Sequence, residues 1–237
     1  MYNHNVKDSL EKQQGKNMEK HLDFMRHTSI FKGISSKDFE LLLDTLDSQL
    51  KFYTKGQIVL QAGGKVSRAA LLLEGNVEIF REGFWGAHYV IGEVNPGELF
   101  AVAFASNDKL VSNVTCAAST NCVILWFDLQ EIFNLDDNGH YHTILIKNLM
   151  STLSLQSLNL SAKMSHVTQK TTREKLLSYL SEEAYKNGSN EFDIPFDRQA
   201  LANYLSVERS AMSNELSKLQ KAGYLTSKRN HFILHKH

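Results

Sequence analysis

Residues 197–223 read DRQALANYLSVERSAMSNELSKLQKAG, and this stretch decides the fold of the C-terminal part of the chain. Asp197 can cap a helix over residues 198–205, because its carboxylate can accept from the first free backbone N–H groups. A two-residue turn follows, and a second helix is predicted over residues 208–222. Gly223 ends that helix as a C′ glycine. Two short helices joined by a tight turn are typical of a helix-turn-helix motif.

The apolar and polar positions of this stretch separate onto different faces of the two helices. The apolar set, which would lock the helices together, is Ala202, Leu205, Val207, Met212, Leu216 and Leu219. The polar set faces outward, and such side chains can reach base edges and phosphates in a DNA major groove. We therefore expect DNA contacts from Gln199, Arg209, Ser210, Ser213, Asn214 and Lys218.

The flanking sequence favours a winged form of the motif. An amphipathic helix is predicted over residues 172–185, and a short strand over residues 192–196. Residues 224–234 form a predicted hairpin, or wing, after the second helix. The side chains at its tip that suit backbone phosphates are Lys228, Arg229 and His231. The alternative is a helical interaction domain with an ordinary polar face.

Charge is distributed unevenly along a chain that is neutral as a whole. The 237 residues contain 26 Lys and Arg and 26 Asp and Glu. From Phe196 to the end there are seven basic and three acidic residues, so this segment carries +4 and the rest −4. A basic C-terminal module on an acidic body is consistent with a nucleic-acid partner.

Residues 51–128 have the texture of a β domain, preceded by a helix predicted over residues 37–50 that Ser35 or Ser36 can cap. Eight glycines lie between Gly56 and Gly97, among short apolar or alternating runs. Short strands with regular turn signals predict a β-sandwich or small barrel. The predicted strands are Gln57–Gln61, Ala69–Leu73, Val77–Phe80, Tyr89–Val94, Asn113–Ala117 and Val123–Phe127.

Residues 128–187 are predicted to be helical, with a break near residues 167–172. A seam spaced alternately by four and three residues runs along the first long helix: Ile146, Met150, Leu153, Ser157, Leu160, Met164 and Val167. This heptad pattern favours a parallel dimer through residues 141–167; the alternative is a helix packed on its own domain. A wider apolar surface, expected to pack on the β domain of the same chain, is formed by Leu145, Leu149, Leu155 and Leu158.

From about Phe24 onward the sequence resembles the CRP/FNR superfamily of catabolite-activator and fumarate-nitrate regulators. The resemblance is carried by LLLEGNVEIF at residues 71–80, NPGELF at residues 95–100 and LANYLSVERSAMSNEL at residues 201–216. It implies an α+β fold: an N-terminal cyclic-nucleotide-binding-like β-roll (a cupin-like double-stranded β-helix), a long dimerisation helix and a C-terminal winged helix-turn-helix. The domains expected are a flexible arm at 1–17, a sensor domain at 18–137, the dimerisation helix at 138–167 and the DNA-binding domain at 168–237.

The resemblance also assigns roles within the second helix of the motif. Arg209 matches an arginine that commonly contacts DNA, and Ser210 and Ser213 match its neighbours. Asn214 stands where an arginine is usual, and asparagine would prefer adenine to guanine. Ser206 replaces the usual glycine of the turn.

The effector site departs from the cyclic-AMP-binding pattern. Those members carry a glutamate that binds the ribose and an arginine that neutralises the phosphate. Here the corresponding stretches are FAVAF at residues 100–104 and LVSNV at residues 110–114, and no arginine occurs between Arg81 and Arg173. A buried phosphate without a cation would be costly, so we do not expect cyclic AMP. An unidentified small molecule would be lined by Glu98, Leu99, Ala101, Ala103, Asn113, Thr115, Leu160 and Ser161.

Cofactor and enzyme chemistry find little support in the residue types present. Cys116 and Cys122 are the only cysteines, too few for an iron–sulfur cluster, and they are predicted to be buried structural thiols. His88, His140 and His142 are available as haem ligands, but such positions are more often solvated. His88 is the only histidine of the β region, and there is no Gly-x-Ser-x-Gly or phosphate-binding glycine loop. We expect no cofactor, no metal and no catalytic site.

The sequence has no run of about 18 apolar residues and no apolar signal-peptide core near its N-terminus, so no membrane span and a cytoplasmic location are expected. The partners expected are double-stranded DNA, a second copy of the chain and a small-molecule effector, with RNA polymerase as a further candidate. Two alternatives stay open: a ligand-independent regulator, and a ligand-binding module that signals through protein contacts.

Overall fold

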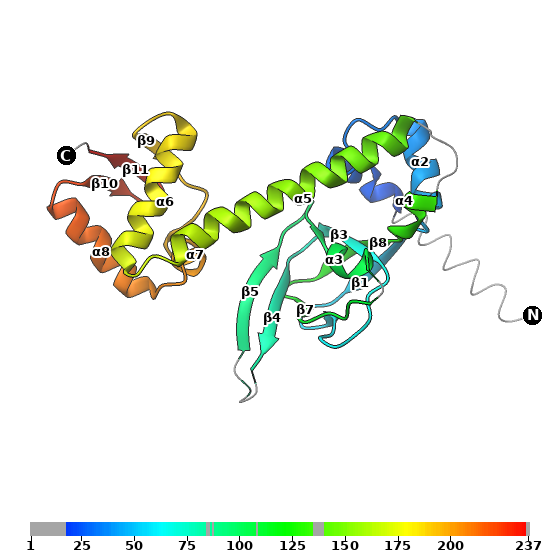
Figure 1. The fold of residues 1–237 in the computed structure, drawn as a ribbon, viewed down its shortest axis with the longest axis horizontal. Coiled ribbons are helices and arrows are strands. Elements are labelled where there is room, and N and C mark those ends of the chain that lie inside the picture. The colour runs from blue at the N-terminus through cyan, green and yellow to red at the C-terminus, as the bar shows by residue number, and fades with distance from the viewer. Residues whose placement is uncertain (1–17, 84–85, 87, 108, 135–139, 236–237) are drawn as a thin grey trace, which may run out of the picture. The chain divides into compact units, whose positions relative to one another are not determined.

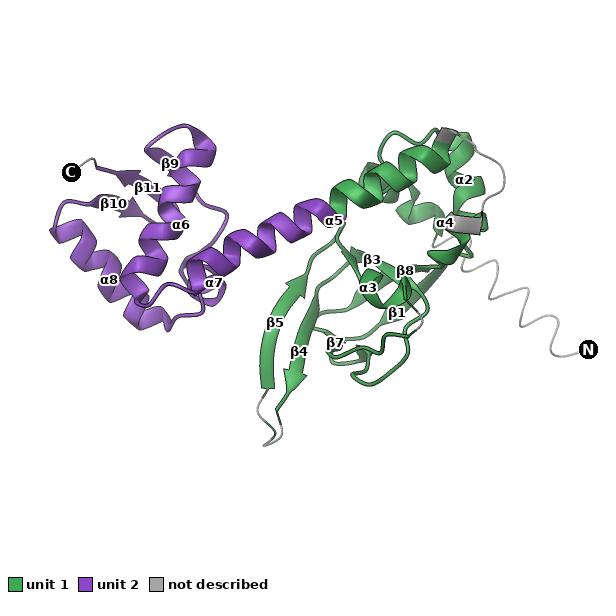
Figure 2. Cartoon of the chain, in the orientation of Figure 1, with its two compact units in different colours: residues 1–152 green, residues 153–237 purple. Residues whose placement is uncertain are grey.

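The structure is a computed structural model that describes residues 18–83, 86, 88–107, 109–134 and 140–235 (Figure 1). It divides into two compact units, residues 1–152 and 153–237, and the long helix α5 (His140–Val167) contributes to both (Figure 2). The arm expected at residues 1–17 lies outside the described residues. The four domain limits expected from the sequence are finer than this division and stay predictions.

The first unit is a β-roll of two antiparallel four-stranded sheets, with strand orders β1-β8-β3-β6 and β2-β7-β4-β5. The strands are β1 Gln49–Tyr53, β2 Ile58–Leu60, β3 Ala69–Glu74, β4 Val77–Glu82, β5 His88–Val94, β6 Leu99–Phe100, β7 Thr115–Ala118 and β8 Cys122–Phe127. A helix over residues 18–27 and the helices α2 (Ser36–Thr45), α3 (Val102–Ala105) and α4 (Gln130–Asn134) accompany the sheets. All six predicted strands are confirmed within about two residues.

Strand β3 explains the uninterrupted apolar run at its centre, because it is buried on both faces. Ala69, Leu71 and Leu73 belong to the core shared with the helices. Ala70 and Leu72 point the other way, into the core between the two sheets. Alternate side chains of a strand face opposite sides, so a strand covered on both sides has no polar face.

Helix α2 begins as predicted but ends earlier. The hydroxyl of Ser35 accepts a hydrogen bond from the N–H of Asp38, and Phe39 and Leu42 are buried. The helix stops at Thr45 rather than at Leu50, because the chain turns at Asp47 (φ +46°) to enter β1. The pairing of β1 with β8 decides this boundary, and local helix propensity does not reveal it.

The second unit contains a three-helix core with a three-stranded sheet of order β10-β11-β9. Its elements after α5 are α6 Thr172–Asn187, β9 Glu191–Asp193, α7 Arg198–Tyr204, α8 Arg209–Lys221, β10 Leu225–Lys228 and β11 His231–Leu234. The predicted order of helix, strand, helix-turn-helix and hairpin is confirmed. Of the six residues expected to lock α7 to α8, Val207 is half-buried and the others are buried.

Helix α5 exposes much of the predicted seam in the single chain. Met150, Leu153, Leu160 and Met164 are 63%, 37%, 63% and 52% exposed, whereas Ile146 packs against the core of the first unit. Leu145 and Leu149 are buried as expected, but Leu155 and Leu158 are exposed, contrary to expectation.

Candidate nucleic-acid interface

The N-terminus of α8 is capped by the side chain of Glu208, which the sequence predicted to be the first residue inside the helix. One oxygen of the Glu208 carboxylate accepts hydrogen bonds from the backbone N–H groups of Ser210 (2.6 Å) and Ala211 (3.2 Å). The Ser210 hydroxyl donates to the same oxygen. These bonds hold the pKa of the Glu208 carboxyl below its usual value, the Ser210 hydroxyl first and the backbone N–H groups next. The cap thus fixes the first turn of the helix.

The turn between α7 and α8 is held from both sides. The N–H of Val207 donates to the carbonyl of Ala202 at 3.0 Å. Lys175 of α6 donates through Nζ to the carbonyls of Leu205 (3.3 Å) and Ser206 (3.4 Å). Ser206 adopts φ +51°, which is the left-handed region that glycine enters without steric cost. The turn therefore requires the conformation that the missing glycine would supply.

A shallow hollow surrounds the exposed first turn of α8. It is lined by Gln199, Val207, Glu208, Arg209, Ser210 and Ser213. The side chain of Arg209 is exposed, and the Ser213 hydroxyl donates to the carbonyl of Arg209 at 2.9 Å. Gln199 donates to the side-chain carbonyl of Asn203 at 3.0 Å. Gln199, Arg209, Ser210 and Ser213, four of the predicted DNA-contacting residues, therefore share one concave surface.

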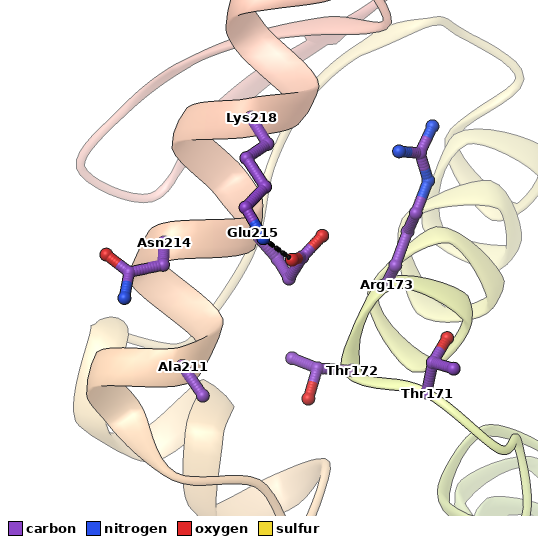
Figure 3. A pocket seen from close by; sticks show the side chains of 7 residues that line it. All are labelled: Thr171, Thr172, Arg173, Ala211, Asn214, Glu215 and Lys218. Carbon is purple, nitrogen blue, oxygen red and sulfur yellow. Dashed lines mark hydrogen bonds and ion pairs between the residues drawn. The ribbon is translucent and has the colours of Figure 1, made fainter.

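A second groove separates the other flank of α8 from the start of α6 (Figure 3). Its lining residues are Thr171, Thr172, Arg173, Ala211, Asn214, Glu215 and Lys218. Lys218 is ion-paired with Glu215 at 2.6 Å, so the predicted contact residue is partly neutralised. The guanidinium of Arg173 lies 4.9 Å from the centroid of the Tyr224 ring. Arg173 was missed from the sequence because only the packing of α6 brings it beside α8.

Two of the three side chains predicted to contact phosphates from the wing are exposed, whereas the histidine is paired with carboxylates. Lys228 and Arg229 are exposed at the hairpin turn, where Arg229 has φ +56°. His231 instead lies 3.1 Å from Asp193 and 3.3 Å from Glu191 across the β9–β11 pair. It therefore joins the two strands, and the expectation of a phosphate contact loses its support.

Arg198 contributes to the basic charge of the C-terminal segment, but its side chain packs within the second unit. Its Nη2 donates to the hydroxyl of Ser227 on β10 at 3.0 Å, and its guanidinium lies 5.0 Å from the centroid of the Phe232 ring. Burial lowers the pKa of Arg198 from its usual value. This arginine ties the start of α7 to the wing.

The predicted effector-lining residues of the first unit are divided among different environments. Leu99 and Thr115 are buried, the first in the helix-facing core and the second bonded to the N–H of Ala62 at 3.3 Å. Ala101 is half-buried at φ +61°, whereas Ala103 and Asn113 are exposed. The Glu98 carboxylate accepts from the N–H of Asn95 at 2.8 Å, which folds it back onto its own turn. Leu160 and Ser161 are exposed on α5.

A cation that is distant in sequence, Arg81, lies beside one of these positions, Asn113. Arg81 of β4 donates through Nε to the carbonyl of Asn113 at 3.1 Å.

Both cysteines are buried and free, and burial raises the pKa of the Cys116 thiol to about 11, so it stays protonated. Within the described ranges, no three His, Cys, Asp or Glu side chains gather as a metal site. None of the described helices has both the length and the apolar character needed to cross a bilayer.

Comparison with known families gives two separate matches along the chain. Residues 50–138 match the cyclic nucleotide-binding domain family, and residues 174–237 match the Crp-like helix-turn-helix domain family. No curated protein sequence matches the chain.

Solved structures with the same fold cover most of the chain. CprK in complex with OCPA is 14% identical, with a TM-score of 0.61 over 83% of this chain and 91% of that one. The c-di-GMP responsive global regulator CLP of Xanthomonas campestris is 19% identical, with a TM-score of 0.54 over 86% and 100%. A putative cAMP-binding regulatory protein from Silicibacter pomeroyi DSS-3 is 20% identical, with a TM-score of 0.51 over 92% and 95%. At these identities the structures show the shared fold, and the two family matches carry the assignment: the chain is a DNA-binding transcription regulator of the CRP/FNR family.

Proposed function

We propose that this protein binds a pseudo-palindromic DNA operator as a homodimer and that a small molecule other than cyclic AMP modulates the binding. The main support for DNA binding is the exposed first half of α8, where Arg209 and Asn214 line two hollows. Arg209 would read a base edge, and Asn214 would favour adenine. A DNA reader acts where the chromosome lies, so the proposal includes a cytoplasmic location.

Phosphate contacts would come from the edges of the same surface. Lys228 and Arg229 of the wing are exposed on one side. Arg173 and Lys218 line the groove on the other side. Cations that flank a reading helix fix its register on the duplex without reading sequence.

The exposed α5 seam supports the homodimer. Met150, Leu160 and Met164 are more than half exposed in the single chain, which is unusual for apolar residues at heptad spacing. A parallel pair of α5 helices would bury them. Two recognition helices related by a two-fold axis would then read half-sites about 34 Å apart.

The charges near the predicted effector positions disfavour a cyclic phosphate. The stretch at residues 110–114 has no cation of its own, and the nearby Arg81 is already bonded to the Asn113 carbonyl. A cyclic phosphate would therefore have only the remaining N–H donors of the exposed Arg81 and no cation from that stretch. The names of the three similar structures mention cAMP, c-di-GMP and OCPA, so this fold accommodates different ligands. Native mass spectrometry of the freshly purified protein would reveal the dimer and the mass of any retained ligand.

Selection from a random duplex library tests the DNA-binding function. We expect an enriched inverted repeat whose binding weakens steeply with salt, since several phosphates are neutralised. Enrichment of a single unpaired half-site would remove the dimer from the proposal. Failure to retain any duplex at low salt, with and without cell metabolite extract, would leave a module that acts through protein contacts.

A further inference from the structure

A hollow in the β-roll is lined by none of the positions that the sequence assigned to an effector, although its lining residue Gln61 donates to Thr115 Oγ1 at 3.5 Å. Its walls come from β1, β2, the loop after β2 and β8. The chemically distinctive lining residues are Lys51, Tyr53, Lys65, Arg68 and Trp126. Glu98, Asn113 and the other predicted effector residues are not among its lining residues. The hollow is therefore a candidate site whose lining residues differ from those of the predicted effector site.

The lining of this hollow is positively charged. It contains three cations and no Asp or Glu. Arg68 is already satisfied, because its guanidinium donates to the carboxylate and carbonyl of Asp47. Lys51 and Lys65 are exposed, and neither has an ion-pair partner within the described part of the chain. Lys51 Nζ lies 5.8 Å from the centroid of the Trp126 ring. Two uncompensated ammonium groups at an aromatic wall favour an anion.

Trp126 supplies an independent observation. The residue is only 7% exposed, and its indole Nε1–H has no hydrogen-bond partner among the described residues. The Tyr53 phenol is near enough for this N–H to offset part of the pKa increase that burial causes in Tyr53, yet the two groups are outside hydrogen-bonding geometry. A buried donor without an acceptor is destabilising, so such a group usually has a hydrogen-bond partner.

We propose that this hollow binds a small aryl carboxylate. The carboxylate would lie between the ammonium groups of Lys51 and Lys65, and it would accept from the buried Trp126 N–H only after the side chains that cover this donor move. The ring would contact the half-buried Tyr53 and Val59, which also line the hollow. Charge-assisted hydrogen bonds are the stronger class, and they select a carboxylate over a neutral alcohol of the same size.

Tryptophan fluorescence measures this binding directly and without DNA, so its outcome is independent of the proposed operator binding. The chain has two tryptophans, and Trp85→Phe leaves Trp126 as the single reporter. Titration with benzoate and phenylacetate should give a saturable change in emission. Benzyl alcohol, which keeps the ring, and acetate, which keeps the charge, should each bind at least tenfold more weakly. A response to both acids that stays linear, or equal binding of benzyl alcohol, would overturn the proposal.

Charge variants locate the site. Lys51→Gln and Lys65→Gln should each weaken benzoate binding about tenfold, the loss of one charge-assisted hydrogen bond. Lys55→Gln is the matched control, because Lys55 lies in the turn between β1 and β2 but does not line the hollow. Trp126→Phe, followed by calorimetry, removes the N–H and keeps a ring. If that variant fails to fold, the two lysine variants still decide: affinities equal to that of the control would refute the site.

Discussion

The carboxylate of Glu208 accepts the backbone N–H of Ser210 at 2.6 Å and also binds the hydroxyl of that serine. This pair fixes the first turn of α8, from which Arg209 projects. It also occupies Ser210, which the sequence assigned to DNA. In the free protein the hydroxyl of Ser210 supports the helix, so a DNA contact from it would require a rearrangement of the cap.

The cap predicts the behaviour of two substitutions. Glu208→Ala should fray the first turn of α8 and weaken operator binding, because the N–H groups of Ser210 and Ala211 lose their acceptor. Glu208→Asp should retain both, since aspartate is a good N-cap residue. Amide hydrogen exchange at residues 209–212 checks the helix end. Equal protection in the two variants would mean that the cap is dispensable.

The same pair predicts an acid-sensitive end of the helix. The folded-state pKa of Glu208 is lowered from its usual 4.5, so ionisation stabilises the fold. This contribution is fully present above the ordinary pKa and is lost as the pH falls through the lowered one. Carboxyl carbon chemical shifts recorded against pH should show Glu208 titrating below 4.5 in the wild type. In Ser210→Ala the titration should move upward, because the largest cause of the shift is removed; an unchanged midpoint would contradict this account.

Arg209 is predicted to be the main reader of sequence. Arg209→Ala should weaken binding to the selected operator by about 1–3 kcal/mol, which is a loss of about fivefold to 150-fold, and relax the preference at one base pair. Lys221→Ala removes the same charge from the far end of α8 and serves as the control. Fluorescence anisotropy with the operator and with point-mutated duplexes gives both quantities. Equal losses in the two variants would show that charge alone matters at Arg209.

Arg173 is predicted to contact a phosphate rather than a base. Arg173→Gln should weaken all duplexes alike and reduce the slope of log K against log salt by about 1. Arg173→Lys keeps the charge and should keep the slope, even though the contact with the Tyr224 ring changes. A selective effect on one base pair would instead place Arg173 in the groove of the DNA.

The sequence predicted those parts of the fold that local patterns determine. Six of the strands of the β-roll and the order of elements after Thr171 follow from alternation, turn residues and capping, all of which act within a few residues. The strands β1 and β6 and the short α3 were missed, because their existence depends on pairing or packing with distant segments. Ala101, the N-cap of α3, has φ +61°, and this left-handed conformation cannot be predicted from an alanine.

The candidate interface shows the same limit. Arg209 and Asn214 were identified because helical spacing places them opposite the apolar face of α8. The place of Arg173 in the interface could not be predicted, because it depends on the packing of α6 beside α8. The structural role of Arg198 could not be predicted either, because it depends on a hydrogen bond to Ser227 of the wing. Side chains that act within one element could be predicted, whereas those whose roles depend on a second element could not.

The α5 seam predicts that one acidic substitution separates the dimer. Leu153→Asp should place two carboxylates opposite each other in the buried seam, which is destabilising without partners. Asn159→Asp adds the same charge to an exposed position off the seam and should leave the dimer intact. Sedimentation velocity distinguishes the two. An unchanged sedimentation coefficient for Leu153→Asp would discard α5 as the interface.

Ser206 predicts an increase in stability. At φ +51° its side chain is strained, and removing the Cβ should relieve a cost of about 1 kcal/mol. Ser206→Gly should therefore raise the urea midpoint of the C-terminal unit, because the Lys175 bond to the carbonyl of Ser206 does not involve the side chain. Ser217→Gly, in the middle of α8, should lower stability by about 0.5 kcal/mol, since glycine is a poor helix former. Opposite signs for two identical substitutions eleven residues apart in sequence are what a left-handed turn requires. A loss of stability in Ser206→Gly would mean that the gain in unfolded-chain entropy outweighs the strain.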